Sequence, residues 1–431
     1  MAGLVLIGTL FLFILIGFPI AVSIGLSCVL YVLAFHTVPM DFIIQSFLNG
    51  TYSFTLLAIP FFVLSGELMI NGGISQRLIN FCMSLIKNRK GGLGMVTVIA
   101  CMFFAAISGS GPATVACIGG IMIPQMIRYG YDKEFSTSIT AAAGSLGPII
   151  PPSIMFLLYG VVNQVSVSKL FMGGVVPGVL MGIALLFMTK LICGKKNFTP
   201  PPEVAEESEK LFNVKISRSF RESFWALLVP VIILGGIYGG IFSPTEAAVV
   251  ACMYALFVGF FIYKELRIKD LPMIFIRAFR SCSFLIVISF SVAFGKLMAM
   301  EGVPTAIADA VLGVSQNKYV VLLLINLLLL GVGMIMDAAP ATIILGPLLL
   351  GIVQPLGVDP IHFGVIMIMN LSIGMVTPPV GVNLFVGTKI SKIPMENTFG
   401  YTLKLLAGMI IVLMLVTYIP FFSMALPNLF V

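Results

Sequence analysis

Long apolar segments recur along almost the whole chain and limit it to a membrane fold. Apolar windows of about 17 to 25 residues, the length that a bilayer-spanning helix needs, follow one another from Gly3 almost to the C-terminus. Within lipid, only helices or closed barrels satisfy every backbone polar group. Uninterrupted apolar runs such as residues 320–330 lack the alternation of a barrel strand, so the pattern predicts an all-α polytopic membrane protein.

Composition excludes several other classes of protein. The seven cysteines are scattered singly and the two histidines are far apart, so we expect neither a cofactor nor a metal site other than one for sodium. The formal charge of +7 is explained by lysine and arginine in short loops between apolar segments, which argues against nucleic-acid binding. The chain has no GxxxxGK[ST] loop and no nucleophile–base pair, so we predict that it is not an enzyme. Residues 1–35 lack a basic region and a cleavage site, and we expect them to be a retained membrane helix.

The two halves of the chain match each other at a shift of about 227 to 229 residues. The residues at 112–114 (Pro-Ala-Thr) meet those at 340–342, and the Gly-x-Asp sequence at 130–132 meets 357–359. The Ser-x-Gly sequence at 145–147, followed by two prolines, meets 372–374, also followed by two prolines. The polar stretch between the halves suggests three units: a first repeat at 1–193, a cytoplasmic linker at 194–223 and a second repeat at 224–431.

Loop charges predict that the two repeats have opposite orientations in the membrane. In the first half, the loop at 36–51 has no lysine or arginine, whereas the loops at 87–90 and 128–134 are basic. In the second half, the equivalent first loop at 264–280 is basic, whereas 354–362 has no lysine or arginine. Since cytoplasmic loops carry the lysine and arginine excess, equivalent loops face opposite sides, as in inverted-topology repeats of secondary transporters.

The same loop charges suggest that one helix pair in each repeat enters and leaves on one face. We predict re-entrant helical hairpins at 92–127 and 319–354, and broken helices at 135–163 and 363–388. The count then gives about ten spanning segments plus two hairpins, with both termini on the periplasmic side.

Glycine, proline and hydroxyl residues cluster at the tips of these hairpins and at the helix breaks. Glycine and proline interrupt helices there and free carbonyl oxygens, which together with serine and threonine hydroxyls can cage a small cation. Half-helix N-termini offer positive dipole ends to a carboxylate. Four such motifs in two related pairs favour two equivalent cation cages over simple helix kinks.

Ionisable residues near these motifs leave alternatives open. Asp337 is the only acidic residue in a hairpin tip, and it is either a functional group at membrane depth or a helix N-cap. Glu246 follows Ser243 in a capping-box pattern. Glu67 and Lys296 occupy equivalent places, where they pair with each other, contact another subunit or reach an interface. Arg128 borders the first hairpin and either attracts an anionic substrate or reflects the positive-inside rule.

Several of these segments resemble the large (DctM-type) membrane subunit of tripartite ATP-independent periplasmic (TRAP) transporters, and the resemblance covers essentially the whole chain. The segments are ISGSGPATVACIGGIMIP (107–124), SLGPIIPPS (145–153), GMIMDAAPATIILGPLL (333–349), SIGMVTPPVGVN (372–383), LLAIPFFVLSGELM (56–69) and IFSPTEAAVV (241–250). The resemblance implies an elevator-type, sodium-driven importer in the bacterial inner membrane. Its partners would be a small four-helix membrane subunit and a periplasmic binding protein that delivers an organic anion of the C4-dicarboxylate or sialic acid class.

The family pattern also implies site residues. Sodium sites carry over to Ser108, Ser110, Thr114, Ser145 and Gly147 in one half, and to Asp337, Thr342, Ser372, Gly374 and Thr377 in the other. As substrate contacts we predict Pro148, Pro152, Ser153, Asn383 and Arg128. The alternative function is a stand-alone ion-coupled carboxylate symporter or antiporter that needs no binding protein.

Overall fold

The computed structural model of the chain describes residues 2–52, 54–86, 91–196, 198, 201–204, 215–303, 306 and 317–429. All regular structure in these residues is helical, which confirms the predicted class. The basic loop at 87–90 and, within the predicted linker, residues 197, 199–200 and 205–214 lie outside the described residues. The helices are α1 (Ala2–Ile16), α2 (Ile20–Phe35), α3 (Met40–Thr51), α4 (Ala58–Asn71), α5 (Ile74–Ile86), α6 (Gly92–Ser108), α7 (Gly111–Arg128), α8 (Lys133–Gly144), α9 (Ile154–Val162), α10 (Val167–Lys195), α12 (Ile216–Tyr238), α13 (Pro244–Phe257), α14 (Leu271–Ser281), α15 (Leu285–Met300), α17 (Lys318–Ile335), α18 (Ala338–Val353), α19 (Pro360–Gly374), α20 (Val382–Ser391), α21 (Phe399–Tyr418) and α22 (Phe421–Leu429).

Seven helical segments in the described part of the chain are long and apolar enough to cross a membrane. Five further apolar helices are shorter, among them α6, α18 and α19. One of the seven is Lys318–Ile335, the first arm of a predicted hairpin. The number of spans and the re-entrant course of the hairpins therefore stay predictions.

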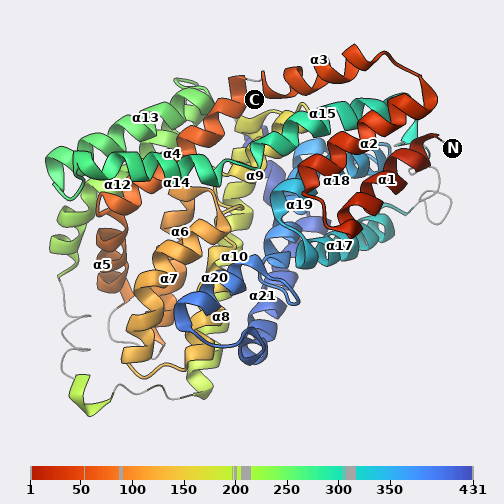
Figure 1. Ribbon diagram of the computed structural model, residues 1–431. Helices are drawn as coiled ribbons and strands as arrows, with labels where there is room; N and C mark the ends of the chain where they lie inside the picture. The colour runs from red at the N-terminus through yellow and green to blue at the C-terminus, as the bar shows by residue number, and fades with distance from the viewer. Residues whose placement is uncertain are drawn as a thin grey trace.

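The helices form a long upper tier over a larger body (Figure 1). In the upper tier, α4 packs against α13 and α14, and α15 packs against α2 and α3. In the body, α6, α7 and α8 pack together with α20, while α10 packs against α21 and α22. The cavity described below lies where α4 meets the tip between α6 and α7.

Each predicted hairpin range holds two helices joined by a very short connection. Between α6 and α7, Gly109 adopts a left-handed conformation with φ 61°, which a residue with a Cβ atom rarely adopts. Between α17 and α18, Asp337 is the N-cap of α18. Each predicted broken helix consists of two helices separated by an irregular segment: residues 145–153 between α8 and α9, and residues 375–381 between α19 and α20.

The two halves of the chain are interleaved. Helix α9 of the first half packs against α18 of the second, and α20 of the second half packs against α7 and α8 of the first. The equivalent residues Asp132 and Asp359 begin α8 and α19, and they lie toward opposite ends of α21. Tyr401, near the start of α21, donates a hydrogen bond to Asp132, whereas Thr417, near its end, accepts one from the side chain of His362 on α19.

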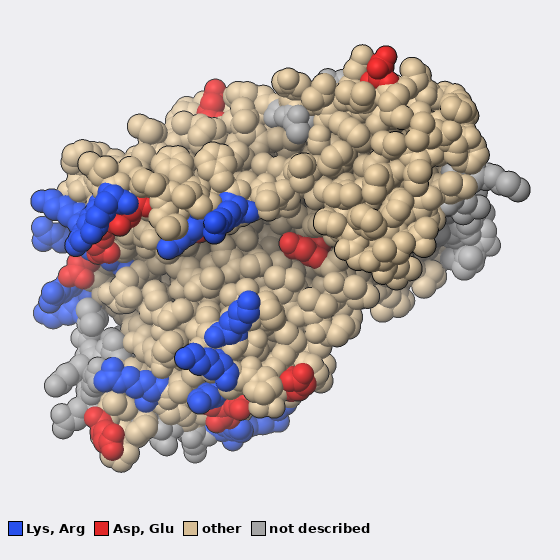
Figure 2. Space-filling view, viewed as in Figure 1, with Lys and Arg blue, Asp and Glu red and all other residues tan. Residues whose placement is uncertain are grey.

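The surface agrees with a lipid environment. Figure 2 shows charged side chains gathered along one side and the lower part of this face, and a wide, mostly uncharged area elsewhere. Large apolar side chains are exposed on α17, including Leu327 at 59% and Ile335 at 70% exposure. Such contiguous apolar surface needs lipid or a partner helix to cover it.

Candidate functional site

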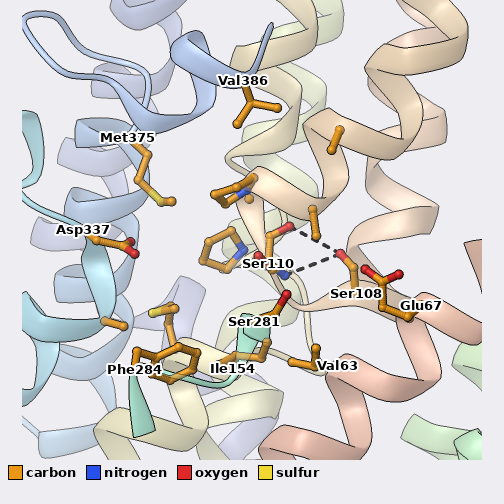
Figure 3. Close-up of a pocket in the computed structure, with 18 of the residues that line it drawn as sticks. Val63, Glu67, Ser108, Ser110, Ile154, Ser281, Phe284, Asp337, Met375 and Val386 are labelled. Carbon is orange, nitrogen blue, oxygen red and sulfur yellow. Dashed lines mark hydrogen bonds between the residues drawn. The ribbon is translucent and has the colours of Figure 1, made fainter. Parts of the chain in front are cut away.

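A cavity of about 440 Å³ lies between α4, the tip of the α6–α7 pair and Asp337. Asp337 enters it from one side, and Ser108 and Glu67 lie on the opposite side (Figure 3). The N-terminal ends of α7 and α18 both reach this cavity, through Gly111 and Ala339. The lining residues are Val63, Gly66, Glu67, Ile70, Ser108, Ser110, Gly111, Pro112, Ala113, Ala116, Pro148, Ile154, Met155, Ser281, Phe284, Asp337, Ala339, Met375 and Val386.

The first tip brings three oxygen atoms within hydrogen-bond distance of one another. The hydroxyls of Ser108 and Thr114 are 2.9 Å apart, and the Thr114 hydroxyl donates to the carbonyl oxygen of Ser110 at 2.7 Å. The Ser108 hydroxyl also lies 3.4 Å from that carbonyl oxygen. Both hydroxyls are buried, with exposures of 4% for Ser108 and 0% for Thr114. These are neutral oxygens of the kind that coordinate small hard cations.

The broken helix of the first half holds this tip by close backbone contact. A methyl group on Gly147 would lie 2.5 Å from the carbonyl oxygen of Ser110. The backbone N–H of Ile154 donates to the carbonyl oxygen of Gly109 at 3.3 Å. The tip and the break between α8 and α9 therefore form one packed unit, in which glycine at 147 is required by space.

The second tip has a similar backbone arrangement and a different set of side chains. A methyl group on Gly374 would lie 2.5 Å from the backbone of Gly333 in α17, and the N–H of Val380 donates to the carbonyl oxygen of Met334 at 3.2 Å. Asp337 accepts a hydrogen bond from the N–H of Ala338 at 2.7 Å. Asp337 is therefore the N-cap of α18, and its carboxylate also lines the cavity, so a functional role for this residue stays a prediction.

Hydroxyls near the second tip are engaged by their own helices. Thr342, Ser372 and Thr377 each donate to the carbonyl oxygen four residues earlier, at 2.7, 2.7 and 2.8 Å. Ser145 of the first half likewise donates to the carbonyl oxygen of Ala142 at 2.6 Å. The structure thus brings the hydroxyls of Ser108 and Thr114 into direct contact, although Thr114, like these other hydroxyls, also donates to a backbone carbonyl oxygen of its own segment.

Asn383 links the second half to the first tip. Its side-chain amide donates to the carbonyl oxygen of Ala141 at 3.3 Å, and a methyl group on Gly111 would lie 2.9 Å from its Oδ1 atom. Asn383 is fully buried, and its Oδ1 has no hydrogen-bond partner among the described residues. A buried, unpartnered carbonyl oxygen is costly unless a ligand or water satisfies it.

The other predicted substrate contacts lie at different distances from the cavity. Pro148 lines it, together with the predicted cation ligands Ser108, Ser110 and Asp337. Pro152 and Ser153 are buried behind it, where the Ser153 hydroxyl caps α9 by accepting from the N–H of Phe156. Arg128 ends α7, 17 residues after Gly111, which is about 26 Å along a helix. The structure does not bring Arg128 to the cavity.

Of the lining residues, Ser108, Ser110, Pro148 and Asp337 were predicted as site residues, and the others, among them Glu67, Ser281 and Phe284, were not. Glu67 on α4 faces the first tip, and Ser281 and Phe284 approach from the junction of α14 and α15. Glu67 had a signal in the sequence, since Gly66-Glu67-Leu68-Met69 matches 295–298, but the match does not say which face of α4 meets the tip. Its counterpart Lys296 donates to Ser46 at 3.3 Å. The predicted capping box of Ser243 and Glu246 is confirmed.

Comparisons with known proteins show which transporters the chain is similar to. The family model of the DctM component of tripartite ATP-independent periplasmic transporters matches residues 7–422. The chain is 37% identical to the C4-dicarboxylate TRAP transporter large permease protein DctM of Rhodobacter capsulatus, over 100% of this chain and 99% of that protein. It is 38% identical to the sialic acid TRAP transporter large permease protein SiaM of Vibrio cholerae, over 96% of each.

A longer relative is also similar. The isethionate TRAP transporter permease protein DctMQ of Oleidesulfovibrio alaskensis is 46% identical over 96% of this chain, which spans 65% of that protein's length. Among solved structures, the YdaH transporter of Alcanivorax borkumensis matches with a TM-score of 0.61 at 14% identity, over 86% of each chain. At that identity the likeness concerns the fold alone.

Proposed function

The chain belongs to the DctM family, the large permease of tripartite ATP-independent periplasmic transporters, and we propose that a sodium gradient drives its import of an organic anion. Relatives are named for C4-dicarboxylates, sialic acid and isethionate, so the substrate class is a small carboxylate or sulfonate. The observation that carries the proposal is the meeting of two helix-pair tips at one cavity, each with oxygen groups suited to a cation.

Sodium binds at the two tips in this proposal. At the first tip, the ligands are Ser108, Thr114 and the Ser110 carbonyl oxygen, with Ser145 and Gly147 supporting them from the broken helix. At the second tip, Asp337 supplies a full negative charge, and Thr342, Ser372, Gly374 and Thr377 supply carbonyl and hydroxyl oxygens after a small rearrangement. The unpartnered Oδ1 of Asn383 beside Gly111 gives the first tip one more oxygen.

The organic anion occupies the cavity between the tips. Its volume of about 440 Å³ falls within the usual range for small-molecule sites, which is roughly 300 to 1,000 Å³. The N-terminal ends of α7 and α18 direct their positive dipole ends toward it, as helix termini do at many anion sites. Sodium at the tips would then offset the charges of Asp337 and of the substrate together.

An elevator-type movement of inverted repeats fits this arrangement. The tips and the broken helices would move as one body against α4, α13, α14 and α15. The opposite placement of Asp132 and Asp359 along α21 supports opposite orientations of the two halves.

The chain works with partners in this proposal. A small four-helix membrane subunit completes the scaffold, and a periplasmic binding protein delivers the anion. The chain lies in the inner membrane of a bacterium, with both termini on the periplasmic side.

Uptake into proteoliposomes tests the proposal. Labelled succinate, sialic acid and isethionate are offered with and without an inward sodium gradient, the small subunit and a binding protein. Uptake of one of them that needs all three components is the expected result. Sodium-dependent uptake by this chain alone would favour the stand-alone symporter, and uptake indifferent to sodium would refute the coupling.

A further inference from the structure

A row of buried polar side chains runs through the packed helices α17, α19 and α21. His362 and Asn370 lie on α19, Asn326 on α17 and Thr417 on α21, and each is between 0% and 3% exposed. None of these residues lines the cavity between the tips. Polar side chains inside a membrane bundle are rare and need a reason, because the surrounding helices and lipid are apolar.

These side chains form a continuous set of contacts. A ring nitrogen of His362 lies 3.3 Å from the carbonyl oxygen of Thr417. The amide of Asn326 donates to the Thr417 hydroxyl at 3.1 Å, and the amide of Asn370 donates to Oδ1 of Asn326 at 2.6 Å. The contacts therefore lead step by step from His362 to Asn370.

The two ends of the row differ. The His362 end opens into a cavity of about 150 Å³ that Lys318, Asp359 and Thr417 also line. At the other end, Oδ1 of Asn370 has no hydrogen-bond partner among the described residues, although Asn370 is fully buried. Asn370 lies one helical turn before Gly374, where α19 ends, and the distance from His362 to Gly374 is about 18 Å along the helix.

Comparison with the first repeat shows that the fold does not require these polar groups. At the shift of 227 residues that relates α8 to α19, His362 corresponds to Phe135 and Asn370 to Ala143. Both counterparts are fully buried apolar residues. Interhelical hydrogen bonds account for the contacts between the asparagines, but they leave Oδ1 of Asn370 without a partner among the described residues.

We propose that this row is an internal water path, in which a water molecule binds Oδ1 of Asn370 and hydrogen bonds through Asn326 and Thr417 connect it to the cavity at His362. Water fits because it donates to the unpartnered oxygen, and the cavity at the His362 end is lined by both an ammonium, Lys318, and a carboxylate, Asp359, which together favour neither a cation nor an anion. A cavity of that size holds about five waters at roughly 30 Å³ each. The path ends at Asn370, one helical turn before Gly374; its use in hydrating a sodium ion at the second tip rests on the proposed function.

Thiol reactivity tests the water path without measuring transport. In a protein whose seven native cysteines are replaced, Asn370→Cys is compared with Ala143→Cys at the equivalent place in the first repeat. The probe is methyl methanethiosulfonate, a small neutral reagent that reaches both sites through the bilayer. Because the reacting thiolate needs hydration, its formation is suppressed in dry apolar surroundings. We expect Asn370→Cys to react at least about tenfold faster, and equal slow rates would overturn the proposal.

Two further variants locate the path. Adding Asn326→Leu to Asn370→Cys should slow the reaction of the introduced cysteine with the reagent toward the rate of Ala143→Cys. An unchanged reaction rate would contradict the route through Asn326. If Asn370→Cys does not fold, Thr417→Cys and Leu413→Cys form a second pair, because both residues are buried one turn apart on α21. Fast reaction at Thr417→Cys alone is expected, and no difference within this pair would again overturn the path.

Discussion

The two halves of the chain build their tips on the same backbone plan and place different chemistry on it. In both halves a glycine of the broken helix touches the backbone of the paired helices, Gly147 at Ser110 and Gly374 at Gly333. In the first half the tip oxygens are neutral and bond one another. In the second half a carboxylate, Asp337, stands at the cavity. The two tips therefore share their packing and differ in charge, so we expect the two proposed cation sites to bind sodium with unequal affinity.

The shared packing predicts the largest effects. Gly147→Ala and Gly374→Ala each place a methyl group 2.5 Å from backbone atoms, so we expect each to lower the free energy of unfolding by about 1 to 3 kcal/mol and to abolish most uptake. Thermal unfolding of the purified variants measures the first effect. As controls, Gly120→Ala and Gly331→Ala meet no heavy atom within 4 Å and should be neutral or slightly stabilising. Equal losses in both pairs would show that helix glycines in general, and not these contacts, are essential.

The difference in charge predicts unequal sodium dependence. Asp337→Asn should raise the sodium concentration for half-maximal uptake at least tenfold, which corresponds to about 1.4 kcal/mol. Ser108→Ala or Ser145→Ala removes a neutral hydroxyl and should raise it about threefold, within the usual range for one hydrogen bond. Glu246→Gln is the control, because Glu246 also caps a helix but lies away from the cavity. Equal effects of Asp337→Asn and Ser108→Ala would show that the charge of Asp337 does not make the two tips unequal.

Glu67 adds a second carboxylate on the side of the cavity that faces Asp337. It repels an organic anion without capping a helix, so Glu67→Gln should lower the KM for the anion about threefold, a change of under 1 kcal/mol. Uptake at varied substrate concentration, at saturating sodium, measures this. An increase in KM would mean that Glu67 binds the substrate or holds a group that does.

The smallest effect on stability is expected at Asp132, which begins the broken helix of the first half as Asp359 does in the second half. Burial raises the pKa of Asp132, but hydrogen bonds from Lys196 and Tyr401 and the charge of Lys196 outweigh it, so the pKa lies below its usual value. Asp359 instead accepts from the backbone N–H groups of Ile361 and His362. Lys196→Met should cost less than about 1 kcal/mol, because the ion pair is partly exposed.

This contribution also has a defined pH dependence. A carboxyl with a lowered pKa in the folded state stabilises the protein above its unfolded pKa of about 4. The stabilisation is lost as pH falls through the folded pKa. The difference in melting temperature between the native protein and Lys196→Met should therefore be present at pH 7 and shrink below pH 4. A difference that grows in acid would contradict the assignment to Asp132.

The sequence allowed much of this architecture to be predicted, because glycine, proline and hydroxyl residues at a helix break have few other uses in a membrane. The repeated Pro-Ala-Thr motifs located both tips, and Asp337 was predicted to face the site or to cap a helix. The far wall of the cavity was not predictable, since Glu67 and Ser281 reach it through packing between helices distant in sequence. Hydroxyl residues also do not reveal their partners, and Ser372 and Thr377 bond to their own helices.

Direct sodium binding tests the central claim of two unequal cation sites most directly. Equilibrium dialysis of the purified protein with radioactive sodium gives the number of bound ions and their affinities, for the native chain, Asp337→Asn and Thr114→Ala. We expect at least two ions in the native protein, loss of one in Asp337→Asn, and weaker binding of a different one in Thr114→Ala. Unchanged numbers and affinities in both variants would contradict it.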